Sequence, residues 1–271
     1  LVFITFLIFG SYYCSGQEKE VSFKDLEQST DSLNSPIYLY KGSPYSGVVS
    51  NYYENGQLGS KVNLINGKLN GLEVGYFENG NIKGKINYIN NLIHGEFEEY
   101  FENGQLKEKA NYINGNLNVL AVSYYSNGNL REEGTFKDGK KDGNWKRYYE
   151  NGQLNEIGDY ANKKKSEEWK TYHDNGQLKN LGNYQKGIKI GEWKYYHENG
   201  QLSGIGNYNE SGFVFGEWKY YHDNGQLKEI GNYNSQFGSP IGEWKTYHDN
   251  GLLRSIGKFQ LFEGSYGIDF Y

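Results

Sequence analysis

Four of the five histidines have a residue type and a regular spacing that could suggest a metal site. They are His173, His197, His222 and His248, and each follows a tyrosine in the same short motif. If each motif belongs to its own hairpin, neighbouring histidines are two strands, or roughly 9.6 Å, apart. Zinc ligands lie about 2.0 Å from the ion they share, so the spacing predicts a column of surface aromatic side chains and no metal site. His94 is isolated.

The acidic and nucleophilic residues give no catalytic arrangement. Glu98 and Glu99 are adjacent, as are Glu167 and Glu168, and successive side chains of a strand point to opposite faces. The single cysteine, Cys14, lies in an apolar leader-like segment. The HDNG motifs lack the alternating acids of a calcium loop, and no glycine-rich stretch leads into a Lys-Ser/Thr helix start. We therefore expect a protein that is not an enzyme and that has no catalytic, metal or cofactor-binding residues.

The motif that contains the histidines is part of a repeat. The fold of this repeat determines where the side chains of any site lie. Asn-Gly pairs begin at residues 55, 79, 103, 127, 151, 175, 199, 224 and 250, so successive spacings are 24 six times, then 25, then 26. Counted from eight residues before each Asn, the nine copies start at Gly47, Gly71, Gly95, Val119, Gly143, Glu167, Gly191, Gly216 and Gly242. Internal periodicity of this length is typical of repeat architectures.

Each copy carries two turn signals separated by short runs rich in Tyr, Trp and Ile. The second signal, such as Asn114-Gly115 or Lys186-Gly187, follows the first by eleven residues, and the longer spacings result from insertions at this second turn. The runs of about seven residues between turns are too short for helices and fit hairpin strands. The sequence predicts an all-β fold, an elongated single antiparallel β-meander of about nine copies of two strands.

The register of these hairpins depends on the Asn-Gly loop. Tryptophan occupies the third repeat position, and Ile or Leu the fifteenth, only in copies five to nine. A three-residue loop with Gly in the left-handed conformation would bring these two positions onto one face. We predict that loop and, with it, a shared Trp/Ile face formed by Trp145, Trp169, Trp193, Trp218, Trp244, Ile157, Ile205, Ile230 and Ile256. This face is either a partner-binding surface or a second core layer.

The opposite face is expected to form the continuous core. It would carry a tyrosine column that includes Tyr148 and Tyr196, a leucine column that includes Leu154 and Leu202, and glycines such as Gly206 on which rings could lie.

The composition and the two ends of the sequence indicate the class of partner, the localisation and the domain boundaries. The net charge of -5 argues against nucleic acid as a partner. Residues 1–16 have the length and apolarity of a signal peptide, which predicts an exported protein; a lipid anchor at Cys14 is the less favoured alternative. Residues 17–46 form an N-terminal segment with a cap strand, and residues 47–271 form the repeat domain. The stretch 264–271 resembles the opening of a tenth copy, so that domain is expected to be either capped or truncated there.

The segment GEWKYYHENGQL, from Gly191 to Leu202, resembles the MORN repeat in its bacterial variant form, as do its counterparts from about Ser46 onward. The resemblance implies an extended meander without a catalytic centre, and such proteins are grouped with a YwqK-like antitoxin family. We expect an exported non-catalytic scaffold that binds a protein partner or itself. The alternatives are an antitoxin-type protein that neutralises a toxin by binding it and, more weakly, a binder of membrane surfaces or glycans through its aromatic columns.

Overall fold

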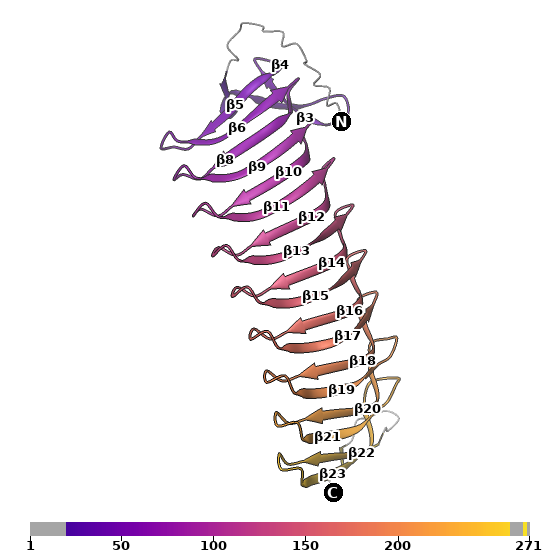
Figure 1. The fold of residues 1–271 in the computed structure, drawn as a ribbon. Coiled ribbons are helices and arrows are strands. Elements are labelled where there is room, and N and C mark those ends of the chain that lie inside the picture. The colour runs from indigo at the N-terminus through magenta and orange to yellow at the C-terminus, as the bar shows by residue number, and fades with distance from the viewer. Residues whose placement is uncertain (1–19, 261–267, 270–271) are drawn as a thin grey trace, which may run out of the picture.

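The computed structural model describes residues 20–260 and the backbone of residues 268–269. The repeats form one long ribbon of hairpins stacked side by side (Figure 1). The architecture is an all-β antiparallel meander, as the sequence predicted. The leader-like segment 1–16, Cys14 and most of the stretch 264–271 lie outside the described residues. No helix of the described part is long and apolar enough to cross a membrane.

Nine hairpins correspond to the nine copies. In chain order their strands are β5 (Gly47–Tyr52), β6 (Leu58–Ile65), β8 (Gly71–Tyr76), β9 (Ile82–Ile89), β10 (Leu92–Tyr100), β11 (Leu106–Ile113), β12 (Asn116–Tyr124), β13 (Leu130–Lys137), β14 (Lys140–Tyr148), β15 (Leu154–Ala161), β16 (Lys164–Tyr172), β17 (Leu178–Gln185), β18 (Ile188–Tyr196), β19 (Leu202–Tyr208), β20 (Val214–Tyr221), β21 (Leu227–Tyr233), β22 (Pro240–Tyr247) and β23 (Leu253–Phe259).

Shorter elements complete the two ends. They are β1 (Val21–Ser22), the 3-10 turn η1 (Phe23–Asp25), β2 (Glu27–Thr30), β3 (Pro36–Tyr40), β4 (Ser43–Pro44), β7 (Lys68–Leu69) and β24 (Ile268–Asp269). Strand β1 pairs in parallel with β5, and β24 pairs with β23. Strands β2 to β4 form a separate small sheet. Around it lies the apolar cluster of the first copy, with Val49 and Leu64 fully buried.

The Asn-Gly loop has the three-residue form that the sequence predicted. In the seventh copy the amide of His197 donates to the carbonyl of Gln201 at 2.8 Å, and the amide of Gly200 donates to the carbonyl of His197 at 2.9 Å. Gly200 has φ +83°, in the left-handed region that glycine enters without a steric penalty. Tyr196 then pairs with Leu202.

A second bulge follows this loop and changes the faces. After the Tyr196–Leu202 pair the register shifts, so that Lys194 pairs with Ile205 and Trp193 pairs with Gly206. Paired residues point to the same side of a sheet, which places Trp193 and Ile205 on opposite faces. The predicted shared Trp/Ile face is therefore wrong. The expectation that glycines share a face with the tyrosine and leucine columns is wrong for the same reason.

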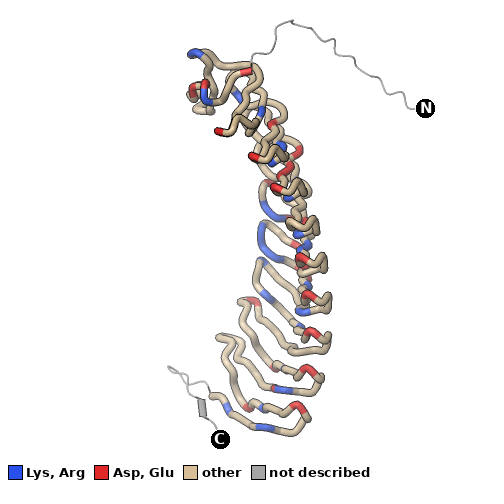
Figure 2. The backbone as a smooth tube through the Cα atoms, turned by 90° about the vertical axis from the view of Figure 1, so that its left-hand side faces the viewer, with Lys and Arg blue, Asp and Glu red and all other residues tan. Residues whose placement is uncertain are grey.

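A kink at the first repeat position bends each hairpin over the Trp face. Between Leu181 and Asn183 of β17, strand β18 holds two extra residues. The first repeat position has positive φ even where it is not glycine: +71° at Val119 and +60° at Glu167. Bulges bend strands and increase their twist. In Figure 2 the C-terminal hairpins accordingly curve instead of lying flat.

Side chains at the Asn-Gly edge join each copy to the next. Asn175 donates to the main-chain carbonyl of Glu198 at 2.7 Å, and the same contact recurs from Asn79 to Asn224. The Asn oxygen also accepts from the amide two residues later, as Asn175 does from Gln177 at 2.9 Å. The Asn-Gly motif is thus both a turn and a link between hairpins, which is a structural reason for its repetition.

Candidate binding surfaces

The five tryptophans form a buried row on one face of the sheet. Trp145, Trp169, Trp193, Trp218 and Trp244 are only 2–5% exposed. Each ring lies on a glycine of the preceding copy: a Cβ built on Gly182 would come within 2.3 Å of the Trp193 ring. The same contact joins Gly134, Gly158, Gly206 and Gly231 to the other four tryptophans. We call the side that carries this row the Trp face.

Aromatic rings and main-chain acceptors enclose each indole. Tyr184 and Tyr208 flank Trp193 edge-on, with ring centroids 5.1 and 6.1 Å away. The indole N–H donates to the carbonyl of Asn183 at 3.2 Å. Aromatic pairs in this geometry add about 0.5–1.5 kcal/mol to the area they bury. A single-layer sheet can therefore bury tryptophan, because its kinked hairpins bring tyrosine rings and main-chain carbonyls around each indole.

Lysines from the second turn cover three of the rings. The ammonium groups of Lys141, Lys165 and Lys189 lie 3.6, 3.8 and 4.1 Å from the ring centroids of the next tryptophan along the chain. This is cation–π distance. Burial lowers the pKa of Lys141 and of Lys189. These lysines belong to the cover of the core and not to a free basic patch.

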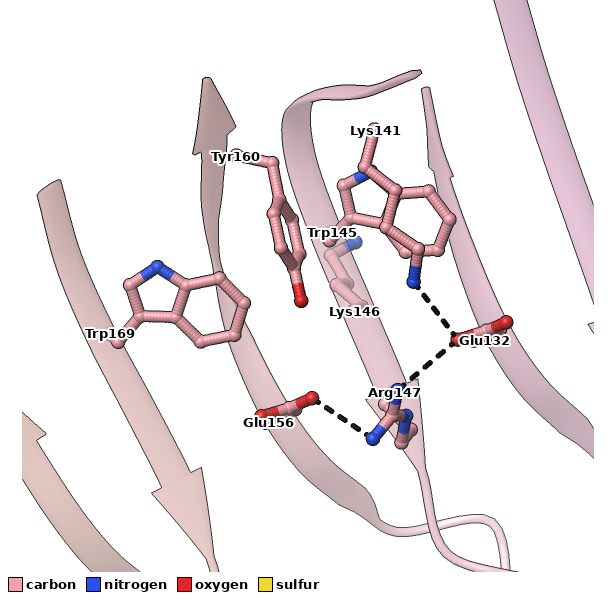
Figure 3. Close-up of a pocket in the computed structure, with 8 residues that line it drawn as sticks. All are labelled: Glu132, Lys141, Trp145, Lys146, Arg147, Glu156, Tyr160 and Trp169. Atoms are coloured by element: carbon pink, nitrogen blue, oxygen red, sulfur yellow. Dashed lines mark ion pairs between the residues drawn. The ribbon is translucent and has the colours of Figure 1, made fainter. Parts of the chain in front are cut away.

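A charged network lies beside the first two tryptophans (Figure 3). Arg147 bridges Glu132 at 3.5 Å and Glu156 at 3.2 Å, and Lys141 reaches Glu132 at 3.7 Å. The hollow that these side chains line holds only about 10 Å³, near the lower limit for one water molecule. A hollow of this size does not hold a substrate-sized molecule, and its ion pairs join the neighbouring strands β13, β14 and β15.

The Trp face is consequently a core layer, which was the second of the two interpretations open from the sequence. The tyrosine and leucine columns lie on the opposite side and are only half buried, with Leu253 52% exposed at the end of the array. In copies five to nine the core was therefore expected on the wrong face. This does not test whether any of these residues binds a partner.

The opposite face of copies five to nine carries a straight row across nine strands, which we call the Ile face. Isoleucine or leucine alternates with lysine in successive pairs: Ile157, Lys170, Leu181, Lys194, Ile205, Lys219, Ile230, Lys245 and Ile256. The apolar members are half buried, and Ile256 is 41% exposed. Each of the four lysines pairs with a glutamate two residues earlier, as Lys194 does with Glu192 at 3.1 Å.

The same side of copies two to four carries ion pairs in place of the apolar column. Glu98 accepts hydrogen bonds from the Tyr100 hydroxyl at 2.7 Å and from Lys85 and Lys109 at 3.2 Å. The hydrogen bond from Tyr100, with help from the two ammonium groups, outweighs burial and holds the pKa of Glu98 at about 2. The array therefore divides into a charged N-terminal half and an apolar C-terminal half on this side.

The histidine column has a structural role that the sequence did not reveal. The Nε2 atoms of His173, His197 and His222 lie 3.0 Å from the main-chain carbonyls of Tyr196, Tyr221 and Tyr247 in the following copy. At the same repeat position the hydroxyl of Tyr149 donates to the carbonyl of Tyr172 at 2.8 Å. Within the described residues no three His, Cys, Asp or Glu side chains are grouped so that they could hold an ion.

The family follows from nine separate matches along this ribbon. A family model described as MORN repeat variant matches residues 45–66, 69–90, 93–114, 117–138, 141–162, 168–186, 189–210, 216–235 and 240–260. The chain belongs to the MORN repeat variant family. MORN repeats are commonly protein or membrane interaction modules, and the long ribbon of hairpins is consistent with a repeat scaffold.

Comparison with solved structures adds little to the family assignment. At 12% identity the chain is similar to parts of "Crystal Structure of TcdB2-TccC3-Cdc42" (TM-score 0.19, 86% of this chain and 14% of that one). It is also similar, at 12% identity, to parts of "Crystal Structure of TcdB2-TccC3 without hypervariable C-terminal region" (TM-score 0.21, 88% and 16%). The chain thus spans less than a fifth of the length of these structures. The comparison with curated proteins gave no match.

Proposed function

We propose that this MORN repeat protein is a non-catalytic scaffold that binds a protein partner along its Ile face. The observation that carries the proposal is the alternating row of Ile or Leu and Lys across β15 to β23. The tryptophans on the other face are already covered by their own chain, whereas this row is half open.

The chemistry of the row favours a protein over a polyanion as its occupant. The lysines are matched by glutamates at 2.8–3.1 Å, so the row carries little net charge. Polyanion binding needs an excess of free Lys or Arg. Nine strands at about 4.8 Å give an apolar stripe about 40 Å long, which suits a protein surface with apolar side chains at regular intervals.

Paired variants can test this surface. The double variant Ile205→Asp, Ile230→Asp places two charges in the row, and the control Ser211→Asp places a like charge on the exposed second turn. Tagged versions of both, with the wild-type chain, would be used to capture partners from the native host and to measure binding of the captured protein. Loss of at least tenfold in affinity for the double variant alone supports the proposal. Unchanged binding by that variant, with an unchanged circular dichroism spectrum, rejects the Ile face.

Export is proposed on the strength of residues 1–16, which have the length and apolar run of a signal peptide. N-terminal sequencing of the protein recovered from its host should begin at Gln17, and recovery of an unprocessed cytoplasmic chain would reject export. Neutralisation of a toxin by direct binding would use the same surface, so the identity of the captured partner would decide between a general scaffold and an antitoxin.

A further inference from the structure

A hollow lies on the Trp face across parts of the first three copies, which have no tryptophan, beside the buried cluster that contains Val49. The hollow measures about 370 Å³, within the range of about 300–1,000 Å³ in which small-molecule sites fall. It is lined by side chains and backbone of β5, β6, β8, β9 and β10, among them Glu73, Gly75, Gly84, Ile86 and Phe97. It lies far along the ribbon from the proposed Ile-face site of copies five to nine.

The hollow exists because small residues and a carboxylate stand where the later copies have tryptophan rings and the side chains packed around them. Glu73 holds the repeat position that Trp193 holds in copy seven. Gly75 pairs with Gly84, and Gly75 also pairs with Ser60 on its other side. A Cβ built on Gly75 would meet nothing closer than the carbonyl of Gly59 at 3.9 Å. Bare backbone is therefore exposed at the floor.

The charged side chains that line the hollow differ in how deeply they are buried. Glu73 is half buried, hydrogen-bonded to Tyr88, and among the described residues no lysine or arginine lies within ion-pair distance of it. The other two carboxylates of the lining already pair with lysines: Glu98 with Lys85 at 3.2 Å and Glu99 with Lys107 at 2.8 Å. Lys83 lies at the rim and is exposed, where solvent screens its charge. Solvent screens the interaction of a ligand with the half-buried Glu73 less than it screens an interaction with Lys83. The Glu73 carboxylate therefore determines which charge a ligand in the hollow should carry.

We propose that this hollow is a binding site for a planar organic cation, which lies flat over Gly75 and Gly84 and places its positive group against Glu73. The walls formed by Phe97, Ile86 and Tyr53 suit an aromatic or guanidinium plane, because such groups stack on aromatic and apolar surfaces. Within the chain, Trp193 already shows a flat ring lying on the backbone of a glycine, Gly182, at another repeat position.

The state of Glu73 without a ligand is consistent with this role. Burial raises the pKa of this carboxyl, and the hydrogen bond from Tyr88 only partly offsets it. A bound cation would offset the cost of holding the charge there.

Three probes of nearly identical shape test the charge and the plane together. Benzamidinium is a planar cation, benzamide its neutral counterpart and benzoate its anionic counterpart. Each would be titrated into the full chain by isothermal calorimetry and by saturation-transfer NMR. We expect benzamidinium to bind with a dissociation constant of about 1 mM or tighter, and benzamide and benzoate to bind at least tenfold more weakly.

Two variants and a matched control locate the binding. Glu73→Gln keeps the size of the side chain and removes its charge, so benzamidinium binding should fall at least tenfold. Gly75→Phe fills the open space and should abolish binding. Glu108→Gln is the control, because Glu108 is also half buried with its pKa raised by burial, yet it does not line this hollow. It should bind benzamidinium as the wild type does.

The outcomes separate support from rejection. Equal binding of benzamidinium and benzamide, or unchanged binding by correctly folded Glu73→Gln, would overturn the proposal, as would no detectable binding of benzamidinium by the wild type. An acetylated and amidated Gly-Arg-Gly peptide tests whether the cation is an arginine of a protein or a free small molecule. If it competes with benzamidinium, an arginine of a protein partner can occupy the site; if only benzamidinium binds, the site takes a free small molecule.

Discussion

Replacing Gly182 by alanine would test most directly how the Trp row is built. The new methyl group would lie 2.3 Å from the ring of Trp193, closer than two carbon atoms that are not bonded can approach unless one of them moves. Gly257 holds the same repeat position at the end of the array, and no atom of the described residues lies within 4 Å of a Cβ built there. Gly257→Ala is therefore a control with the same chemical change and open space.

Two opposing effects set the size of the change. Alanine is favoured over glycine in a strand by roughly 0.5–1 kcal/mol, because it loses less backbone freedom on folding. Overpacking a filled core costs about 1–3 kcal/mol, and full expulsion of a buried tryptophan approaches about 3–5 kcal/mol. The clash outweighs the propensity, so we expect Gly182→Ala to lower the free energy of unfolding by about 2–4 kcal/mol. Gly257→Ala should be neutral or slightly stabilising.

Urea unfolding followed by circular dichroism would measure both variants, and hydrogen exchange would show whether protection is lost first around β17 and β18. A double-mutant cycle with Trp193→Ala adds a second test. Once the ring is absent the clash with it is gone, so the two changes should cost less together than the sum of their separate effects. Additive effects, or a Gly182→Ala variant as stable as Gly257→Ala, would refute the proposed ring-on-glycine contact.

Three further predictions concern the links between copies and the charged half. His197→Tyr should retain its contact with the carbonyl of Tyr221 and the wild-type stability, whereas His197→Ala should cost about 1 kcal/mol in the unfolding free energy. Asn199→Ala should cost about 1–2 kcal/mol, because it removes an acceptor for the amide of Gln201 and a donor to the carbonyl of Asp223. The pKa of Glu98 is depressed to about 2, so its carboxylate stabilises the fold above about pH 4.5 and loses this effect as the pH falls toward 2. Because the site is partly solvated we expect only about 1 kcal/mol from this carboxylate, and Glu98→Gln should flatten the acid limb of stability measured by urea unfolding at stepped pH.

The sequence specified the hairpin loop better than the faces. The Asn-Gly spacing led to the three-residue loop because the turn chemistry is local. The second bulge, between Tyr195 and Tyr196, has no local residue signal, and it reversed the face of every residue beyond it. The hollow beside Glu73 was equally invisible, because it depends on which side chains of three copies meet.

A signal for the correct contact was nevertheless present in the order of the copies. Trp at the third repeat position and Ile at the fifteenth both first appear in copy five, at Trp145 and Ile157, which suggested that they touch. The sixteenth position becomes glycine one copy earlier, at Gly134, where the fifteenth is still Glu133. This offset of one copy fits a ring that lies on the glycine of the preceding hairpin, as the structure shows for Gly134 and Trp145.

The same offset predicts how the row could be extended by one copy. Ala121 holds the tryptophan position of copy four; it pairs with Gly134 on one side and with Ala110 of copy three on the other. Tyr112 and Phe136 occupy the flanking aromatic positions, so two walls for a ring are present, and a methyl group stands where the later copies have glycine. Ala121→Trp alone should destabilise the chain by about 1–3 kcal/mol, because the methyl group of Ala110 blocks the ring.

Adding Ala110→Gly should rescue Ala121→Trp, although glycine alone weakens a strand by roughly 0.5–1 kcal/mol relative to alanine. The sign of the coupling therefore tests the geometry. Strand propensity predicts that adding Ala110→Gly lowers the free energy of unfolding further. Packing of the ring on glycine predicts that it raises the free energy of unfolding. Urea unfolding of the two single variants and the double variant gives this coupling, and the fluorescence maximum of the new tryptophan, compared with that of unfolded chain, reports its burial. A double variant less stable than Ala121→Trp would mean that the identity of the sixteenth residue does not determine where tryptophan can lie in this array.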